Sequence, residues 1–214
     1  MSRRVKRRRT YDSSRRREQA RQTRRAVLDA AHRLFLDQGY AATTVPQVAA
    51  EADVSVETVY KAFGNKPGLV KAVFDVAVMG DDEPIPMLQR ESVRRNMAEP
   101  DPRKKLMAYG EEFCERAARV GPIQLLVKEA AASDAGAAEV WEQLNTERLT
   151  GMTFFARHLH ESGHLRDGVT WQEARDVLWA HISVELWDLL VNQRGWSNKR
   201  YGRWLARQLI AALL

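Results

Sequence analysis

The sequence predicts an all-α fold with an N-terminal helix-turn-helix domain, built as a three-helix bundle, and a larger C-terminal helical domain. Apolar residues recur three or four positions apart along most of the 214 residues, which is the spacing of a buried helix face. The alternating pattern of a half-buried strand is missing. Two short helical segments separated by a tight turn lie between residues 44 and 63.

The N-terminal segment is strongly basic. Residues 1–25 hold twelve Lys and Arg against Asp12 and Glu18, a net charge of +10, whereas the whole chain carries +6. We expect residues 1–22 to form a basic arm that is disordered through residue 14, and a first helix from Arg15 or Thr23 to Gln38. Such an arm on an acidic body is typical of a protein that binds a polyanion, although a solvated tail without a partner has the same composition.

The two short helices have clear boundary signals. Thr44 is a good N-cap, and Pro46 is tolerated in a first helical turn because its missing N–H would be unpaired there. Ser55 caps the second helix, which has an apolar face. Asp53 stands in the turn, where glycine is usual, and Asp is one of the few other residues that tolerate a positive φ. A helix pair of this kind is the helix-turn-helix, whose second helix enters the DNA major groove.

The remaining elements follow from the same signals. Asn65 caps a fourth helix, and the loop at residues 80–86 ends a domain that we place at 23–79. The C-terminal domain then covers 86–214. Its expected helices lie at about 87–97, 102–119, 121–130, 136–162, 171–193 and from Ser197 to the end.

Residues 25–74 contain an ordered set of residues at fixed spacing. The set is Arg25, Leu28, Ala31, Leu34, Phe35, Gly39, Tyr40, Thr43, Thr44, Val45, Val48, Ala49, Ala52, Asp53, Val54, Ser55, Thr58, Val59, Tyr60, Phe63, Lys66 and Leu69. In this set the chain resembles the TetR family of transcriptional regulators, with one departure at Asp53. The resemblance implies a DNA-binding regulator, which we expect to be a repressor that binds a pseudo-palindromic operator as a homodimer and is released by a small molecule.

The candidate contacts with double-stranded DNA lie on and beside the second helix of the pair. They are Thr43, Thr44, Ser55, Val56, Glu57, Thr58, Tyr60, Lys61 and Lys66. Val56 suits a thymine methyl group, Glu57 a cytosine amino group, and Lys61 a guanine or a phosphate. The resemblance implies phosphate contacts for Tyr60 and Lys66. Thr44 and Ser55 are also explained as helix caps alone, and Glu57 as a favourable charge at a helix N-terminus.

The C-terminal domain is expected to bind a small apolar or aromatic ligand and to form the dimer. Candidate ligand-binding residues are Met87, Tyr109, Phe113, Trp141, Phe154, Phe155, His158 and Trp179, each of which is otherwise ordinary core. The resemblance implies a dimer made by the last long helices. Candidates for its seam are Val177, Val184, Leu186 and Leu190, which intrachain packing would explain equally well.

One motif points to a different class of protein. His160, Glu161 and His164 match the H-E-x-x-H pattern of zinc peptidases, in which both His must lie on one face of an intact helix. Gly163 is a helix terminator, so His164 is expected to lie past the helix end. We therefore predict no enzyme, no metal site and no cofactor. A metal-dependent hydrolase stays as the alternative, as does a regulator that answers to a protein instead of a small molecule.

The composition also bears on the compartment. No apolar run approaches the ~18 residues that span a bilayer, and no signal-peptide core follows the basic N-terminus. The single cysteine, Cys114, has no partner for an intrachain disulfide, which fits a reducing environment. The sequence thus predicts a cytoplasmic protein without a membrane partner.

Overall fold

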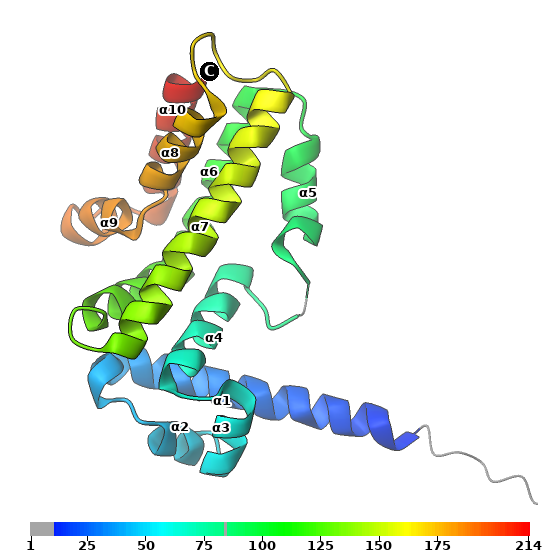
Figure 1. The fold of residues 1–214 in the computed structure, drawn as a ribbon, viewed down its shortest axis with the longest axis vertical. Coiled ribbons are helices and arrows are strands. Elements are labelled where there is room, and N and C mark those ends of the chain that lie inside the picture. The colour runs from blue at the N-terminus through cyan, green and yellow to red at the C-terminus, as the bar shows by residue number, and fades with distance from the viewer. Residues whose placement is uncertain (1–10, 84) are drawn as a thin grey trace, which may run out of the picture.

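The computed structural model describes residues 11–83 and 85–214, and all regular structure in that part of the chain is helical (Figure 1), which confirms the predicted fold class. The first four helices are α1 (Tyr11–Ala42), α2 (Val45–Glu51), α3 (Val56–Phe63) and α4 (Lys66–Met79). The later ones are the 3-10 turn η1 (Met87–Gln89), α5 (Glu91–Ala98), α6 (Pro102–Ala130), α7 (Ala135–Glu161), α8 (Trp171–His181), α9 (Val184–Trp187), the π-helical η2 (Asp188–Gln193) and α10 (Asn198–Leu213). Every helix in the described ranges is too short or too polar to cross a bilayer.

Helix α1 begins earlier than predicted. It starts at Tyr11, inside the segment expected to be a disordered arm, and its first half projects from the body of the molecule as a free rod (Figure 1). Extending an existing helix adds one hydrogen bond per residue without a new nucleation cost, so a buried C-terminal half supports an exposed extension. The Glu18–Arg21 ion pair at 2.7 Å adds to this. The expected disorder of residues 1–10 lies outside the described residues.

The helix-turn-helix forms as its boundary signals predict. The Thr44 side chain accepts a hydrogen bond from the Gln47 amide, and the Gln47 side chain accepts one from the Thr44 amide, so the two form a capping box. Ser55 caps α3 in a similar way through the Thr58 amide at 3.1 Å. Val59 is buried at 1% exposure and anchors the inner face of α3. These contacts leave the opposite face of α3 in solvent.

Asp53 holds the turn between α2 and α3 with a φ of 53°, the one positive φ outside glycine among the described residues. This left-handed conformation is sterically unfavourable for an L-residue, and the cost is lower for Asp than for most others. We expect Asp53→Gly to raise the free energy of unfolding by about 0.5–1 kcal/mol, and Asp53→Ala to lower it by a similar amount. Thermal melting of the two variants beside the parent measures this. A lower Tm for Asp53→Gly would contradict the backbone explanation.

Two predicted helix boundaries in the C-terminal domain are wrong. Helix α6 continues through Gly121 and Pro122, where a new helix was expected. A Cβ atom on Gly121 would lie 2.6 Å from the Trp187 ring, so this glycine permits close packing and does not end the helix. Conversely, the helix expected at 171–193 breaks after His181, because Ser183 accepts from the Leu186 amide and caps a new helix.

The long helices α6 and α7 run antiparallel and stand above the α1–α4 group (Figure 1). Helix α10 packs along α6, and α8 packs along α7. One continuous core contains residues from both levels. It includes Phe35 and Val70 of the lower helices together with Ile123, Val127 and Val140 of α6 and α7. The loop at 80–86 therefore separates the two predicted domains along the chain, while their apolar contacts continue across the junction.

Three of the four residues predicted for a dimer seam pack within their own chain. Val184 is 3% exposed and belongs to the core around α6, α8 and α10. Val177 and Leu190 pack against the same core, and Leu186 is half-buried. Packing within the chain, which was the alternative interpretation, is thus enough to explain the burial of Val184.

Candidate nucleic-acid interface and internal cavity

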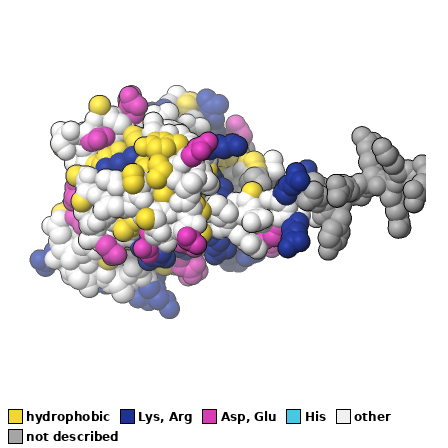
Figure 2. Space-filling view, turned by 90° about the horizontal axis from the view of Figure 1, so that it is seen from below, with side chains coloured by type: hydrophobic (Ala, Val, Ile, Leu, Met, Phe, Trp, Pro, Cys, Tyr) yellow, Lys and Arg dark blue, Asp and Glu magenta, His cyan; other side chains and the backbone are white. Residues whose placement is uncertain are grey.

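The lower end of the molecule presents α2 and α3 to solvent (Figure 1). Seen from below, apolar side chains gather in the middle of this face, with cationic and anionic side chains around them (Figure 2). Val56 and Tyr60 on α3 are 37% and 49% exposed, unusually high for large apolar residues. Glu57 and Lys61 are exposed beside them, and neither forms an ion pair within the described residues. The outer face of α3 is thus free for a partner.

Most predicted DNA contacts lie on this face, but Thr43 does not. Its side chain is 1% exposed, and its hydroxyl donates to the Gly39 carbonyl at 2.8 Å, so it holds the end of α1 in place. Thr44 and Ser55 are exposed while serving as caps. Thr58 is half-buried, and its hydroxyl lies 2.8 Å from the Ser55 hydroxyl. The assignment of Thr43 as a DNA contact is therefore corrected to a structural role.

Lys66 is tied into the protein at the base of α4. Its ammonium lies 4.1 Å from the centre of the Tyr40 ring and donates to the Ala41 carbonyl at 3.4 Å. The Tyr40 hydroxyl in turn donates to Asp134, which caps α7, at 3.4 Å. Burial, helped by the nearby Asp134 carboxylate, raises the pKa of Tyr40 to about 12. Lys66 therefore stands where the lower helices meet the C-terminal domain.

The rod-like first half of α1 starts at Tyr11, four residues before Arg15, which is the earlier of the two starts that the sequence predicted. Exposed arginines along it include Arg15, Arg17 and Arg21. The available signal was the run of good helix formers from Arg15 to Ala20, which contains no Gly or Pro. The helix holds these side chains at fixed spacing along the projecting rod.

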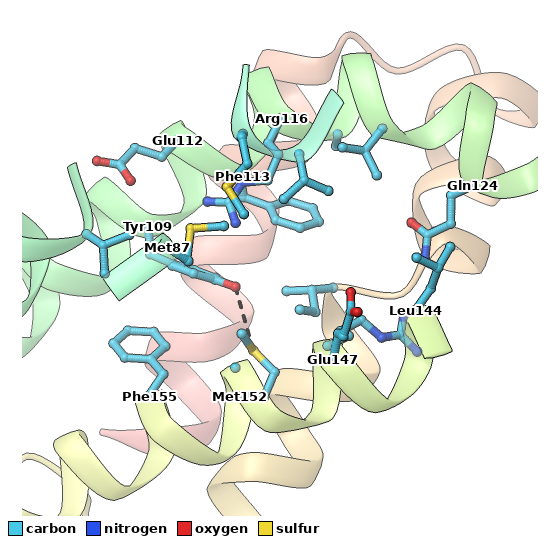
Figure 3. Close-up of a pocket in the computed structure, with 18 of the residues that line it drawn as sticks. Met87, Tyr109, Glu112, Phe113, Arg116, Gln124, Leu144, Glu147, Met152 and Phe155 are labelled. Carbon is cyan, nitrogen blue, oxygen red and sulfur yellow. Dashed lines mark hydrogen bonds between the residues drawn. The ribbon is translucent and has the colours of Figure 1, made fainter. Parts of the chain in front are cut away.

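An internal cavity of about 430 Å³ lies between α4, the α5 segment, α6, α7 and α9. Five of the predicted ligand residues line it, and these are Met87, Tyr109, Phe113, Phe154 and Phe155 (Figure 3). The other three lie outside it. Trp141 packs between the two cores, the Trp179 ring stacks on Arg148, and His158 faces Lys105. The wall is mainly apolar, with a few polar groups, as in ordinary small-molecule sites.

Charged residues that the sequence interpretation did not single out also line the cavity. Asp75 of α4 and Glu147 of α7 are bridged by the Lys71 ammonium, at 2.6 Å and 3.1 Å. Burial raises the pKa of Asp75 in spite of that bridge. Arg116 and Arg148 complete the charged set together with Glu112. Their signal in the sequence was a charge next to the apolar stripe of a long helix, which is also common on solvated faces.

His158, predicted as a ligand contact, belongs to a buried polar pair. The Lys105 ammonium, 1% exposed, lies 2.6 Å from the His158 ring nitrogen and donates to the Met97 carbonyl at 3.1 Å. Burial lowers the pKa of Lys105 and of His158, and the positive charge of Lys105 also opposes protonation of His158. The folded protein thus keeps the imidazole neutral.

This pair predicts a loss of stability in acid. A His whose folded pKa lies below its unfolded value of about 6.5 takes up a proton more readily in the unfolded chain. Stability is therefore full above that pH and falls as the pH is lowered through it. We expect the Tm of the parent to drop between pH 7 and pH 5 more than that of His158→Gln, which keeps an acceptor for Lys105. Equal slopes for both proteins would contradict this account.

The H-E-x-x-H motif does not lie on one helix face. Helix α7 ends at Glu161, and Gly163 follows with a φ of 67°, so His164 lies past the helix end as expected. His160 is exposed. Within the described ranges no group of three His, Cys, Asp or Glu side chains is arranged to hold a metal ion.

Comparisons with known proteins agree with this geometry. The sequence model of the family described as bacterial regulatory proteins, tetR family, matches residues 27–73. The regulator YvkB of Bacillus subtilis is 45% identical over 53 residues, which cover 25% of this chain and 28% of YvkB. The regulator YdeS of the same organism is 29% identical over 164 residues, 77% of this chain and 73% of YdeS.

Solved structures extend the likeness to the whole fold. NalD, the secondary repressor of the MexAB-OprM multidrug efflux pump in Pseudomonas aeruginosa, has a TM-score of 0.70 at 20% identity and covers 91% of this chain and 98% of its own. FadR of Bacillus subtilis, solved with stearoyl-CoA, has a TM-score of 0.67 at 17% identity, over 89% and 100% of the two chains. At such identities the likeness concerns the fold alone. The match over residues 27–73 assigns the helix-turn-helix domain to the TetR family of bacterial regulatory proteins.

Proposed function

We propose that this protein is a transcriptional repressor that binds a pseudo-palindromic operator as a homodimer and leaves it when a small molecule fills the cavity. The observation that carries the proposal is the outer face of α3, on which Val56, Glu57, Tyr60 and Lys61 are all exposed to solvent. Apolar and charged groups at this spacing fit the edges of bases and the phosphates that flank them.

The rod of α1 supports the same proposal. Its arginines add positive charge beside α3, and phosphate neutralisation by such groups supplies much of the affinity of DNA-binding proteins. Because they contact no base, we expect them to add affinity without specificity. The basic residues 3–9 precede the described chain and belong to the same proposal.

The cavity is proposed as the effector site because α4 forms part of its wall. Helix α4 carries Asp75 and packs against α1 and α3, and Lys71 links it to Glu147 on α7. A ligand that separates Asp75 from Glu147 would therefore move α4 and, with it, α3. The mainly apolar wall favours an apolar or aromatic effector, and the FadR complex with stearoyl-CoA is an example of an apolar chain bound by the same fold.

Two copies are needed because one short helix reads too few base pairs for useful specificity. A two-fold dimer matches a pseudo-palindromic site. We propose that the outer sides of α8 and α10 form its interface, since Trp204 and Ile210 on α10 are only half-buried within their own chain. Sedimentation of the purified protein measures the assembly directly.

Selection of bound sequences from a random DNA pool is the decisive test. We expect an enriched site with two inverted half-sites about one helical turn apart, or a multiple of that. A mobility shift on the selected duplex should then show one dimer bound. Recovery of no sequence preference, or a strictly monomeric protein, would contradict the proposed function.

A further inference from the structure

Two arginines line the cavity without a carboxylate partner. Arg116 comes from α6 and Arg148 from α7, and neither forms an ion pair in the part of the chain that the structure describes. A guanidinium that is removed from water without a counter-charge is costly, because its solvation is lost and nothing replaces it. Such a group in the wall of a cavity is therefore a candidate for ligand recognition.

Arg148 is the more deeply placed of the two. One of its terminal nitrogens donates to the Asn145 side chain at 3.0 Å, and the guanidinium carbon lies 4.5 Å from the centre of the Trp179 ring. Its Nε and its other terminal nitrogen are shielded from solvent and have no hydrogen-bond partner. Buried N–H groups of charged side chains are nearly always paired with an acceptor. The described chain supplies no acceptor for these two donors.

Tyr109 supplies a third donor on the opposite wall. It is 8% exposed, and among the described residues its hydroxyl has only the sulfur of Met152 as acceptor, at 3.7 Å (Figure 3). Burial raises the pKa of Tyr109 and the Glu112 charge acts in the same direction, while the charges of Arg116 and Arg148 oppose both. Both cations thus lie within electrostatic range of one neutral phenol.

Three of the nearby acids have a lysine partner of their own. Asp75 and Glu147 share Lys71, and Glu185, which acts on Arg148 from α9, is paired with Lys128 at 2.7 Å. Glu112 lines the cavity too, but its carboxylate points away from Tyr109 in the close-up (Figure 3). The side of the cavity between Arg116, Tyr109 and Arg148 therefore presents donors and positive charge next to an apolar space.

We propose that the cavity binds an amphipathic organic acid, whose carboxylate is held by Arg148, Arg116 and the Tyr109 hydroxyl and whose apolar body fills the space lined by Phe113, Phe155 and their neighbours. The proposal deepens the effector role given above, but the binding step itself requires no DNA. A carboxylate in the cavity would supply the counter-charge that Arg148 and Arg116 lack, and charge-assisted hydrogen bonds are about twice as strong as neutral ones.

Calorimetric titration with three probes of equal chain length tests the head group. The probes are octanoate, octanol and octylamine, which differ only in their polar end. We expect octanoate to bind at least about 10-fold more tightly than octanol at neutral pH, and octylamine to bind weakest. Tighter binding of octylamine would assign the cavity to cations through Asp75, Glu112 and Glu147, and would overturn the proposal. Equal binding of octanoate and octanol, or no binding of any probe, would overturn it as well.

Matched variants locate the carboxylate. Arg148→Met should reduce octanoate affinity by about 10- to 100-fold and leave octanol within about 3-fold, with Arg116→Met as an independent second variant. Arg157→Met is the control, because Arg157 lies on the same helix and stacks on Trp171 at 4.6 Å, as Arg148 does on Trp179, but lies outside the cavity lining. Unchanged octanoate binding in both cavity variants would overturn the proposal. Octanoate binding that depends on Arg148 but releases no operator DNA would uphold the acid site and count against the effector role alone.

Discussion

Replacing Tyr60 and Lys61 together by alanine is expected to lower operator affinity by about 100-fold while leaving thermal stability unchanged. Tyr60 is 49% exposed and Lys61 is exposed, and neither side chain has a partner in the described chain, so their removal costs the fold little. On DNA, each would make a phosphate or base-edge contact in the proposed complex. Titration of the selected operator by fluorescence anisotropy, at fixed salt, measures the change.

The salt dependence separates the two side chains. Lys61→Ala alone should reduce the slope of log affinity against log salt concentration by about 1, because one phosphate charge is no longer neutralised, whereas Tyr60→Ala should leave that slope unchanged. Lys104→Ala is the matched control, since Lys104 is an exposed lysine on α6 and its loss changes the net charge equally. A double variant that binds the operator as well as the parent would remove α3 from the DNA interface.

The sequence predicted the helix-turn-helix in detail because its signals are local. Thr44, Ser55 and Asn65 each accept a hydrogen bond from a backbone amide three residues on, and such caps need no tertiary partner to be recognised. The same holds for Gly163 at the end of α7 and for the strained turn at Asp53. Exposure of the α3 face then followed from the spacing of Val59 and Phe63.

Other assignments failed because they depended on the partner that a side chain meets in the folded chain, whether near or distant in sequence. Thr43 is adjacent to a cap and conforms to the family pattern, but its hydroxyl donates a hydrogen bond to the Gly39 carbonyl. His158 lies on an apolar stripe beside Phe155, yet its ring contacts the Lys105 ammonium, which is 53 residues away in the chain. The arginines of the cavity escaped notice for the same reason. A charge beside an apolar stripe looks the same in sequence whether solvent or a cavity faces it.

Glycines in long helices show the same limit. Gly110, Gly121 and Gly151 all interrupt helical patterns, and each lowers helix propensity by a similar amount. In the structure they differ completely. A Cβ atom on Gly121 would meet the Trp187 ring, whereas one on Gly151 would meet nothing within 4 Å. Only the packing partner decides whether such a glycine is required.

Gly110→Ala is expected to lower the free energy of unfolding by about 2–3 kcal/mol, because the added methyl group has no room between two packed helices. The new Cβ would lie 2.5 Å from the Gly202 carbonyl oxygen and 2.8 Å from the Ala206 Cβ, so α6 and α10 would have to separate. Neither helix backbone can yield locally, and the core on both sides of the contact is fully buried. At 2–4 °C per kcal/mol for a chain of this size, Tm should fall by roughly 4–12 °C.

The identical substitution at Gly151 should act in the opposite direction. There the Cβ enters open space on α7, and alanine restores about 0.5–1 kcal/mol of helix propensity, so the Tm should rise slightly. Because the two variants differ only in location, the general cost or benefit of alanine cancels between them, and the remaining difference in Tm reports the closeness of α6 to α10. If the Tm of Gly110→Ala equalled that of Gly151→Ala, α6 and α10 would have to be farther apart at Gly110 than the structure places them. The packing of the core that positions the cavity wall would then be wrong.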